Sequence, residues 1–135
     1  MRDLIPFLMF CGDVQGKAEE AIEWYCSIFD DAKVLRIDRY GPDEGQPEGA
    51  VRTAAFQIGG HTVMAIDSAG PHDFTFTPAM SLWIECSSVE EIDRVAAALA
   101  EGGAVLMPLD SYGFSARFCW VADRYGVSWQ LNLAE

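Results

Sequence analysis

The chain has 135 residues, of which half are apolar and 22% are charged, a composition typical of one folded globular domain. Nine basic residues stand against 21 acidic ones, which gives a formal charge of −12. Such a field repels phosphate backbones and anionic lipid, so we expect neither a nucleic-acid partner nor a membrane partner. The longest apolar runs, such as residues 4–11, are too short to span a membrane.

The four cysteines form no C-x-x-C pair, and each lies in an apolar run. No charged-then-apolar signal segment opens the sequence. We therefore expect buried, reduced thiols and a cytoplasmic protein. The cysteines are Cys11, Cys26, Cys86 and Cys119.

The first half of the chain predicts one strand, one helix and three further strands. Apolar residues at helical spacing predict the helix, and Gly59-Gly60 predicts a hairpin turn. Residues 41–49, rich in Gly, Pro and acid, predict a loop. The expected elements are a strand over 4–11, a helix over 17–29, and strands over 33–40, 51–58 and 61–67.

The second half repeats this order. Ser88 and Glu91 form a capping box that opens the second helix, and Gly102-Gly103 ends it. We expect one domain of two repeated modules, about 1–69 and 79–135, joined by a linker over 70–78. The expected strands of the second module are 80–86, 104–109, 114–121 and 127–133.

The last strand alternates strictly between two kinds of side chain. On one parity Val127, Trp129, Leu131 and Leu133 are all apolar, so this side should face a core, with Trp129 under a helix. The other parity carries Ser128, Gln130 and Asn132. These small polar groups either line a cavity or meet water.

Five stretches of the chain carry a resemblance to a known family: PFLMF (6–10), KAEEAIEWYCSIFDDAKV (17–34), FTFTPAMSLWIEC (74–86), EGGAVLMPL (101–109) and YGFSARFCWVADRYGVSWQLNL (112–133). With these stretches and its paired β-α-β-β-β modules, the chain resembles the PhnB-like branch of the vicinal-oxygen-chelate superfamily, which is often labelled 3-demethylubiquinone-9 3-methyltransferase. The resemblance implies an α+β fold in which two modules form a curved mixed sheet around a cleft, the glyoxalase/bleomycin-resistance fold. It also implies a homodimer.

The metal-dependent members of this superfamily bind a divalent ion through His or Glu side chains. The corresponding places in this chain are Pro6, Ala65, Ser81 and Gln130. Pro and Ala cannot bind a metal, and Ser and Gln are weak neutral ligands. We therefore expect that the usual metal site is lost and that the protein has no cofactor.

Methyl transfer is not expected either. A dinucleotide-type cofactor fold needs a glycine-rich turn between a strand and a helix. Gly102-Gly103 instead follows a helix, and Gly59-Gly60 lies in a hairpin.

Strand parity predicts a cleft face with an apolar-aromatic floor and a few polar groups, as in small-molecule sites. Its expected ligand-binding residues are Leu8, Phe10, Asp67, Ser81, Trp83, Glu85, Ser128, Gln130 and Asn132.

Two functions remain open for such a cleft. The first is binding of a small, partly aromatic or oxygenated molecule. The alternative is a lyase or isomerase that uses Glu85 or Asp67 as its base. Each residue also has a structural alternative: Glu85 is solvated at a strand end, Gln130 bonds only protein groups, and Trp83 belongs to the core. Cys86 lacks a histidine to activate it, so a buried thiol is favoured over a nucleophile.

Overall fold

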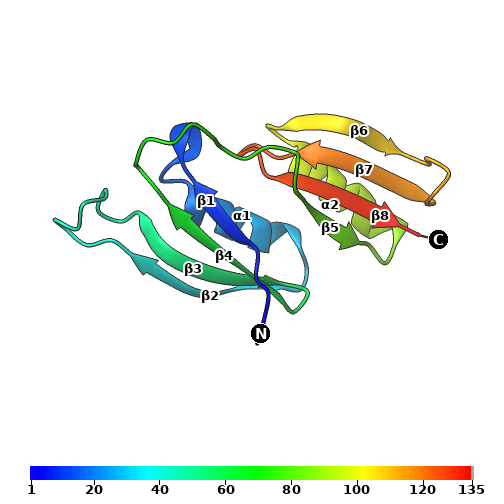
Figure 1. Cartoon of the computed structure of the whole chain (residues 1–135). Helices are drawn as coiled ribbons and strands as arrows, with labels where there is room; N and C mark the ends of the chain where they lie inside the picture. The colour runs from blue at the N-terminus through cyan, green and yellow to red at the C-terminus, as the bar shows by residue number, and fades with distance from the viewer. Residues whose placement is uncertain (135) are drawn as a thin grey trace. The chain divides into compact units, whose positions relative to one another are not determined.

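The computed structural model describes residues 1–134, and the chain divides into two compact units, Met1–Thr75 and Phe76–Glu135. Each unit contains one strand, one helix and three further strands in that order (Figure 1). The predicted pair of β-α-β-β-β modules and the α+β fold class are therefore confirmed. A cleft that the two modules build together stays a prediction.

The N-terminal unit is a four-stranded mixed sheet in the order β1-β4-β3-β2. Strands β1 and β4 are parallel and the other pairs are antiparallel. Helix α1 lies on one face of this sheet (Figure 1). On that face Tyr25 stacks on Phe56, with ring centroids 6.0 Å apart. The elements are β1 (Phe7–Phe10), the 3-10 turn η1 (Gly12–Val14), α1 (Ala18–Ile28), β2 (Ala32–Arg39), β3 (Val51–Ile58) and β4 (His61–Asp67).

The C-terminal unit has the equivalent sheet, in the order β5-β8-β7-β6. Strands β5 and β8 are parallel, and helix α2 covers one face of the sheet (Figure 1). Both sheets are open rather than closed into barrels. The elements are β5 (Ser81–Glu85), α2 (Val89–Ala100), β6 (Ala104–Asp110), β7 (Arg117–Ala122) and β8 (Ser128–Leu133).

Helix α2 begins and ends where the sequence predicts. The Glu91 amide donates to Ser88 Oγ at 3.1 Å, which caps the first turn. Gly102 adopts φ +77° after the last turn, a conformation that favours glycine. At Gly103 a Cβ would lie 2.2 Å from the Ala122 carbonyl oxygen, so any larger residue would push the helix end away from β7. Four buried side chains form the apolar stripe: Ile92, Val95, Ala96 and Leu99.

Two strands begin three residues later than predicted. The first begins at Phe7 rather than residue 4, and Leu4 is 78% exposed. Strand β7 begins at Arg117 rather than residue 114. Gly113 has φ +86°, and the Ser111 hydroxyl donates to the Ser115 carbonyl, so this segment bends before the strand starts. Among residues 1–134, neither helix is long and apolar enough to cross a bilayer.

Replacing Leu131 with Ala should lower the free energy of unfolding by about 2–5 kcal/mol, because Leu131 is fully buried and its loss leaves a void. Urea unfolding measures this cost. The control is Leu106→Ala on the edge strand β6, where the side chain is 40% exposed and the cost should stay below about 1 kcal/mol. Equal costs for the two variants would contradict this placement of the core.

Candidate functional site

The face of the C-terminal sheet opposite α2, called here the open face, carries all six C-terminal residues predicted for ligand binding. The parallel register pairs Ser81 with Ser128, Trp83 with Gln130, and Glu85 with Asn132, so these pairs point to the same side. The other parity is covered by α2, and Trp129 is fully buried there, as predicted. Strand β7 adds Phe118, Trp120 and Ala122 to the open face.

One hydrogen-bonded network crosses the open face from β5 to β7. The hydroxyls of Ser81 and Ser128 lie 2.6 Å apart, and Trp120 Nε1 donates to Ser128 Oγ at 2.8 Å. Gln130 Nε2 donates to Ser81 Oγ at 3.1 Å. Ser128 is buried and Gln130 is half-buried. The Gln130 amide therefore bonds protein groups through its nitrogen, while its carbonyl oxygen accepts no hydrogen bond within residues 1–134.

A second network surrounds Glu85. Trp83 Nε1 donates to Glu85 Oε1 at 2.7 Å, and Asn132 Nδ2 lies 3.2 Å from both carboxylate oxygens. Glu85 is exposed, whereas Asn132 is only 7% exposed and its Oδ1 has no partner in the described part of the chain. No basic side chain among residues 1–134 pairs with Glu85. The carboxylate is thus held in place by neutral donors.

Aromatic rings adjoin this carboxylate. Phe118, which pairs with Asn132 across the sheet, contacts Trp83 at 5.7 Å and Phe114 at 5.1 Å between ring centroids. Tyr112 packs edge-on against Phe118 at 5.8 Å. Trp83 is 49% exposed and Phe114 is 62% exposed, so both rings are accessible. The site is therefore an aromatic surface beside a fixed carboxylate, and Trp83 is not a core residue.

The three N-terminal candidates do not lie on an open face, which corrects the prediction. The parallel register pairs Leu8 with Ala65 and Phe10 with Asp67, and this side of the sheet is the one that α1 covers. Phe10 is fully buried. The Ala18 amide, the first of α1, donates to Asp67 Oδ1 at 3.0 Å, and the Val51 amide donates to Oδ2 at 2.9 Å.

Strand β1 misled the parity assignment because its sequence, FLMF, is apolar on both sides. The side chains opposite α1 are Phe7 and Met9 on β1, with Met64 and Ile66 paired beside them on β4. Asp67, buried at 3% exposure, supplies the cap that the start of α1 lacks, because Lys17 offers no side-chain acceptor. Its carboxylate is bound to backbone on both oxygens, which leaves it poorly placed to act as a base.

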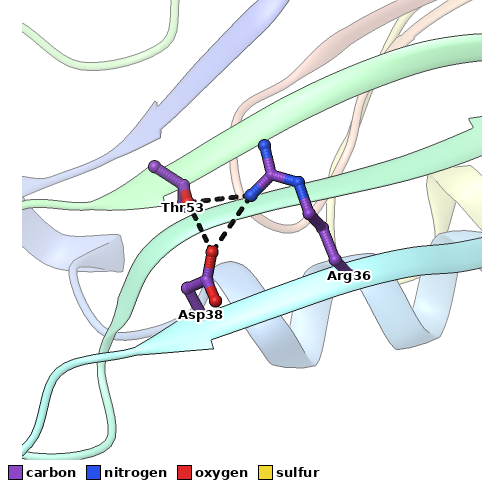
Figure 2. A network of polar contacts seen from close by, with 3 residues as sticks. All are labelled: Arg36, Asp38 and Thr53. Carbon is purple, nitrogen blue, oxygen red and sulfur yellow. Dashed lines mark hydrogen bonds and ion pairs between the residues drawn. The ribbon is translucent and has the colours of Figure 1, made fainter.

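Sequence reasoning missed a polar network on the side of the N-terminal sheet that faces away from α1. Arg36 Nη1 lies 3.2 Å from Asp38 Oδ2 and 3.0 Å from Thr53 Oγ1, and the Thr53 hydroxyl donates to Asp38 at 3.2 Å. Figure 2 shows these side chains on β2 and β3, with the helix behind the sheet. Both charged groups are about half exposed, so the pair adds little stability. The alternating charges of β2 were the available signal.

The donors present do not fit the divalent ion that the superfamily implies. Ala65 lies under α1, so it cannot correspond to Gln130 on an open face. The side chains that do face away from α1 on β1 and β4 are apolar or thioether except for the neutral hydroxyl of Thr62, and this set does not suit a hard cation. In the described residues, no three His, Cys, Asp or Glu side chains cluster to hold a metal.

The cysteines are all free, and three of them are buried. Burial raises the pKa of Cys86 to about 12 and that of Cys119 to about 11. Desolvation also raises the pKa of Cys26. These thiols stay protonated near neutral pH, because the thiolate is the form that burial disfavours. Cys86 is therefore not an activated nucleophile beside Glu85.

The family model described as 3-demethylubiquinone-9 3-methyltransferase matches residues 2–132. The chain belongs to this family. A solved PhnB protein from Bacillus cereus, described with the same methyltransferase name, is 50% identical over 98% of this chain and 100% of its own, with a TM-score of 0.92. Protein PA1353 from Pseudomonas aeruginosa is 27% identical over 98% of each chain, with a TM-score of 0.83. Among proteins with curated descriptions, none matches.

More distant neighbours share the fold of this PhnB-like chain, among them a glyoxylase/bleomycin resistance protein/dioxygenase domain from Frankia sp. EAN1pec, 16% identical over 100% of each chain with a TM-score of 0.65. The fosfomycin resistance protein FosX from Listeria monocytogenes is 13% identical over 100% of this chain and 95% of its own, with a TM-score of 0.67. At that identity the likeness concerns the fold alone. The glyoxalase/bleomycin-resistance fold that the sequence predicts is thereby confirmed.

Replacing Asp67 with Asn should cost about 1–3 kcal/mol of stability, because the amide nitrogen would face a backbone N–H that needs an acceptor. Thermal or urea unfolding measures the loss. The control is Asp43→Asn in the exposed loop, where φ is +59° and Asn is tolerated, with a change of at most about 0.5 kcal/mol. An Asp67→Asn protein of unchanged stability that loses ligand binding would restore Asp67 to the site.

Proposed function

We propose that this protein binds a small, partly aromatic or oxygenated molecule at the open face of its C-terminal sheet. The observation that carries the proposal is an exposed indole, Trp83, fixed beside an exposed carboxylate, Glu85, by a hydrogen bond of 2.7 Å. Gln130 adds a carbonyl oxygen that lacks a donor within residues 1–134. An aromatic surface with a few convergent polar groups is the usual composition of a small-molecule site.

The proposed role involves neither methyl transfer nor the metal of the superfamily. Anionic cofactor groups commonly bind at the N-terminus of a helix that follows a strand. In the connection from β1 to α1, that position is taken by the Asp67 carboxylate, which accepts the first helical amide. Metal chemistry is disfavoured by the donor set, since Ser81 and Gln130 are weak neutral ligands and already bond each other.

Catalysis by Glu85 is the second candidate, as the base of a lyase or isomerase. Its exposure favours this role, because a base must reach its substrate. Binding and catalysis differ in what happens to a bound ligand in D2O. A general base would exchange a carbon-bound proton of the ligand for deuterium, and Glu85→Gln would abolish that exchange. A pure binding protein would leave the ligand unlabelled.

A thermal-shift screen of aromatic and oxygenated metabolites tests the binding proposal. We expect at least one compound to raise Tm for the wild-type protein. Trp83→Ala, which removes the stacking ring, and Ser81→Phe, which fills the surface beside Gln130, should both weaken that compound about tenfold or more. Phe74→Ala removes another exposed ring and serves as the control. Equal affinity in all four proteins would place the ligand elsewhere and contradict the proposal.

We also propose a homodimer and a cytoplasmic location. The free cysteines support a reducing compartment. Strand β1 is a sheet edge, and Phe7 on it is 55% exposed, so a second copy has apolar surface to cover. Sedimentation at roughly tens of micromolar should show a dimer. A monomer at that concentration would count against it.

A further inference from the structure

We propose that the molecule bound at the open face is an organic cation, a protonated amine attached to an apolar or aromatic body. This inference rests on the proposed function, since it names the chemical class of the ligand at the same site. Three independent features of the C-terminal unit support it: the distribution of charge, the unused hydrogen-bond acceptor position on the Glu85 carboxylate, and the aromatic rings around Phe118.

The charges of this unit are one-sided. From residue 76 onward the sequence contains three arginines and no lysine or histidine, against eight acidic residues. None of the arginines belongs to the open face. Arg94 is on α2, Arg117 bonds Asp93 of α2 at 2.6 Å, and Arg124 follows β7 and pairs with Glu101. In the described part of this unit, no basic side chain therefore neutralises the negative charge of the open face.

Glu85 keeps room for a further donor. A carboxylate offers about four lone-pair positions. Trp83 takes one on Oε1, and Asn132 approaches both oxygens at 3.2 Å. These contacts fix the orientation of the carboxylate and leave Oε2 able to accept one more hydrogen bond. A charged N–H donor satisfies that position best, because charge-assisted hydrogen bonds are stronger than neutral ones.

The same sheet row continues toward a second carboxylate. Asn132 pairs with Phe118, and Phe118 pairs with Asp110 on β6. Asp110 is exposed, and within residues 1–134 its Oδ1 accepts a hydrogen bond only from the neighbouring Ser111 amide. Two carboxylates thus stand at the ends of a row whose centre is aromatic, and an anionic ligand placed on that row would be repelled from both ends.

The rings supply the other half of cation recognition. Trp83 and Phe114 both contact the buried Phe118, and both are exposed. A cation over such ring faces is attracted by their quadrupole, most strongly over Trp. The indole donors are already used, since Trp83 Nε1 bonds Glu85 and Trp120 Nε1 bonds Ser128. The free groups are therefore mainly acceptors and ring faces, which match a ligand that donates and carries positive charge.

Three probes of similar shape and different charge test the inference by calorimetric titration. They are the 3-phenylpropylammonium cation, the neutral alcohol 3-phenylpropan-1-ol, and the anion 3-phenylpropanoate. We expect the cation to bind about tenfold more tightly than the alcohol, the anion to bind most weakly, and the preference for the cation to shrink at high salt. Glu85→Gln, which keeps an acceptor for Trp83, should weaken the cation about fivefold and leave the alcohol within about twofold.

The matched control is Glu90→Gln on α2, which removes the same charge from the helix side of the sheet and should change the affinity for the cation by less than about twofold. Equal binding of cation and alcohol to the wild-type protein would overturn the cation inference while leaving the proposed binding site intact. The cation inference would also be overturned if the anion bound most tightly, or if none of the three probes bound. The salt dependence of the wild-type protein gives an answer that does not depend on the variants.

Discussion

The open face depends on which side of β8 packs against α2, and the apolar residues of the strand determine that side. Trp129 and Leu131 are fully buried against α2, and Trp129 Nε1 donates to the buried Asp123 carboxylate at 2.8 Å. A shift of one residue would exchange the two sides of the strand and bury Ser128, Gln130 and Asn132 under the helix. The parallel register with β5 then carries Ser81, Trp83 and Glu85 to the same side. The polar site is thus a consequence of apolar packing on the opposite face.

Most polar groups on that face satisfy one another. Two networks take up the indole donors, the serine hydroxyls and the Asn132 amide nitrogen, so the surface is organised before any ligand arrives. Such preorganisation lowers the entropic cost of binding. Few groups of these networks remain free to contact a ligand: the exposed rings, the carboxylate of Glu85 and the amide oxygen of Gln130. A surface with so few free groups selects ligands by charge and shape.

The sequence predicted the order of elements, both helices and the two sides of β8, because each of these follows from local periodicity and capping residues. Prediction from the sequence failed for features that depend on contacts between segments far apart in the chain. The apolar FLMF of β1 has no preferred side, so only the register with β4 shows that Leu8 and Phe10 face α1. Asp67 resembled a site carboxylate in the sequence, yet it caps a helix that lies 49 positions away along the chain. The aromatic neighbours of Trp83 depend on how the bend before β7 folds back, which no period predicts.

Tryptophan indole resonances test the central claim most directly, since the four indoles report on different parts of the fold. In a ¹H–¹⁵N titration with a ligand found by thermal shift, the Nε1 signals of Trp83 and Trp120 should move, because both rings stand on the open face. The signal of Trp129, buried under α2, should stay in place, as should that of Trp24 on α1. Movement of Trp129 or Trp24 alone, with Trp83 unchanged at saturation, would contradict the account.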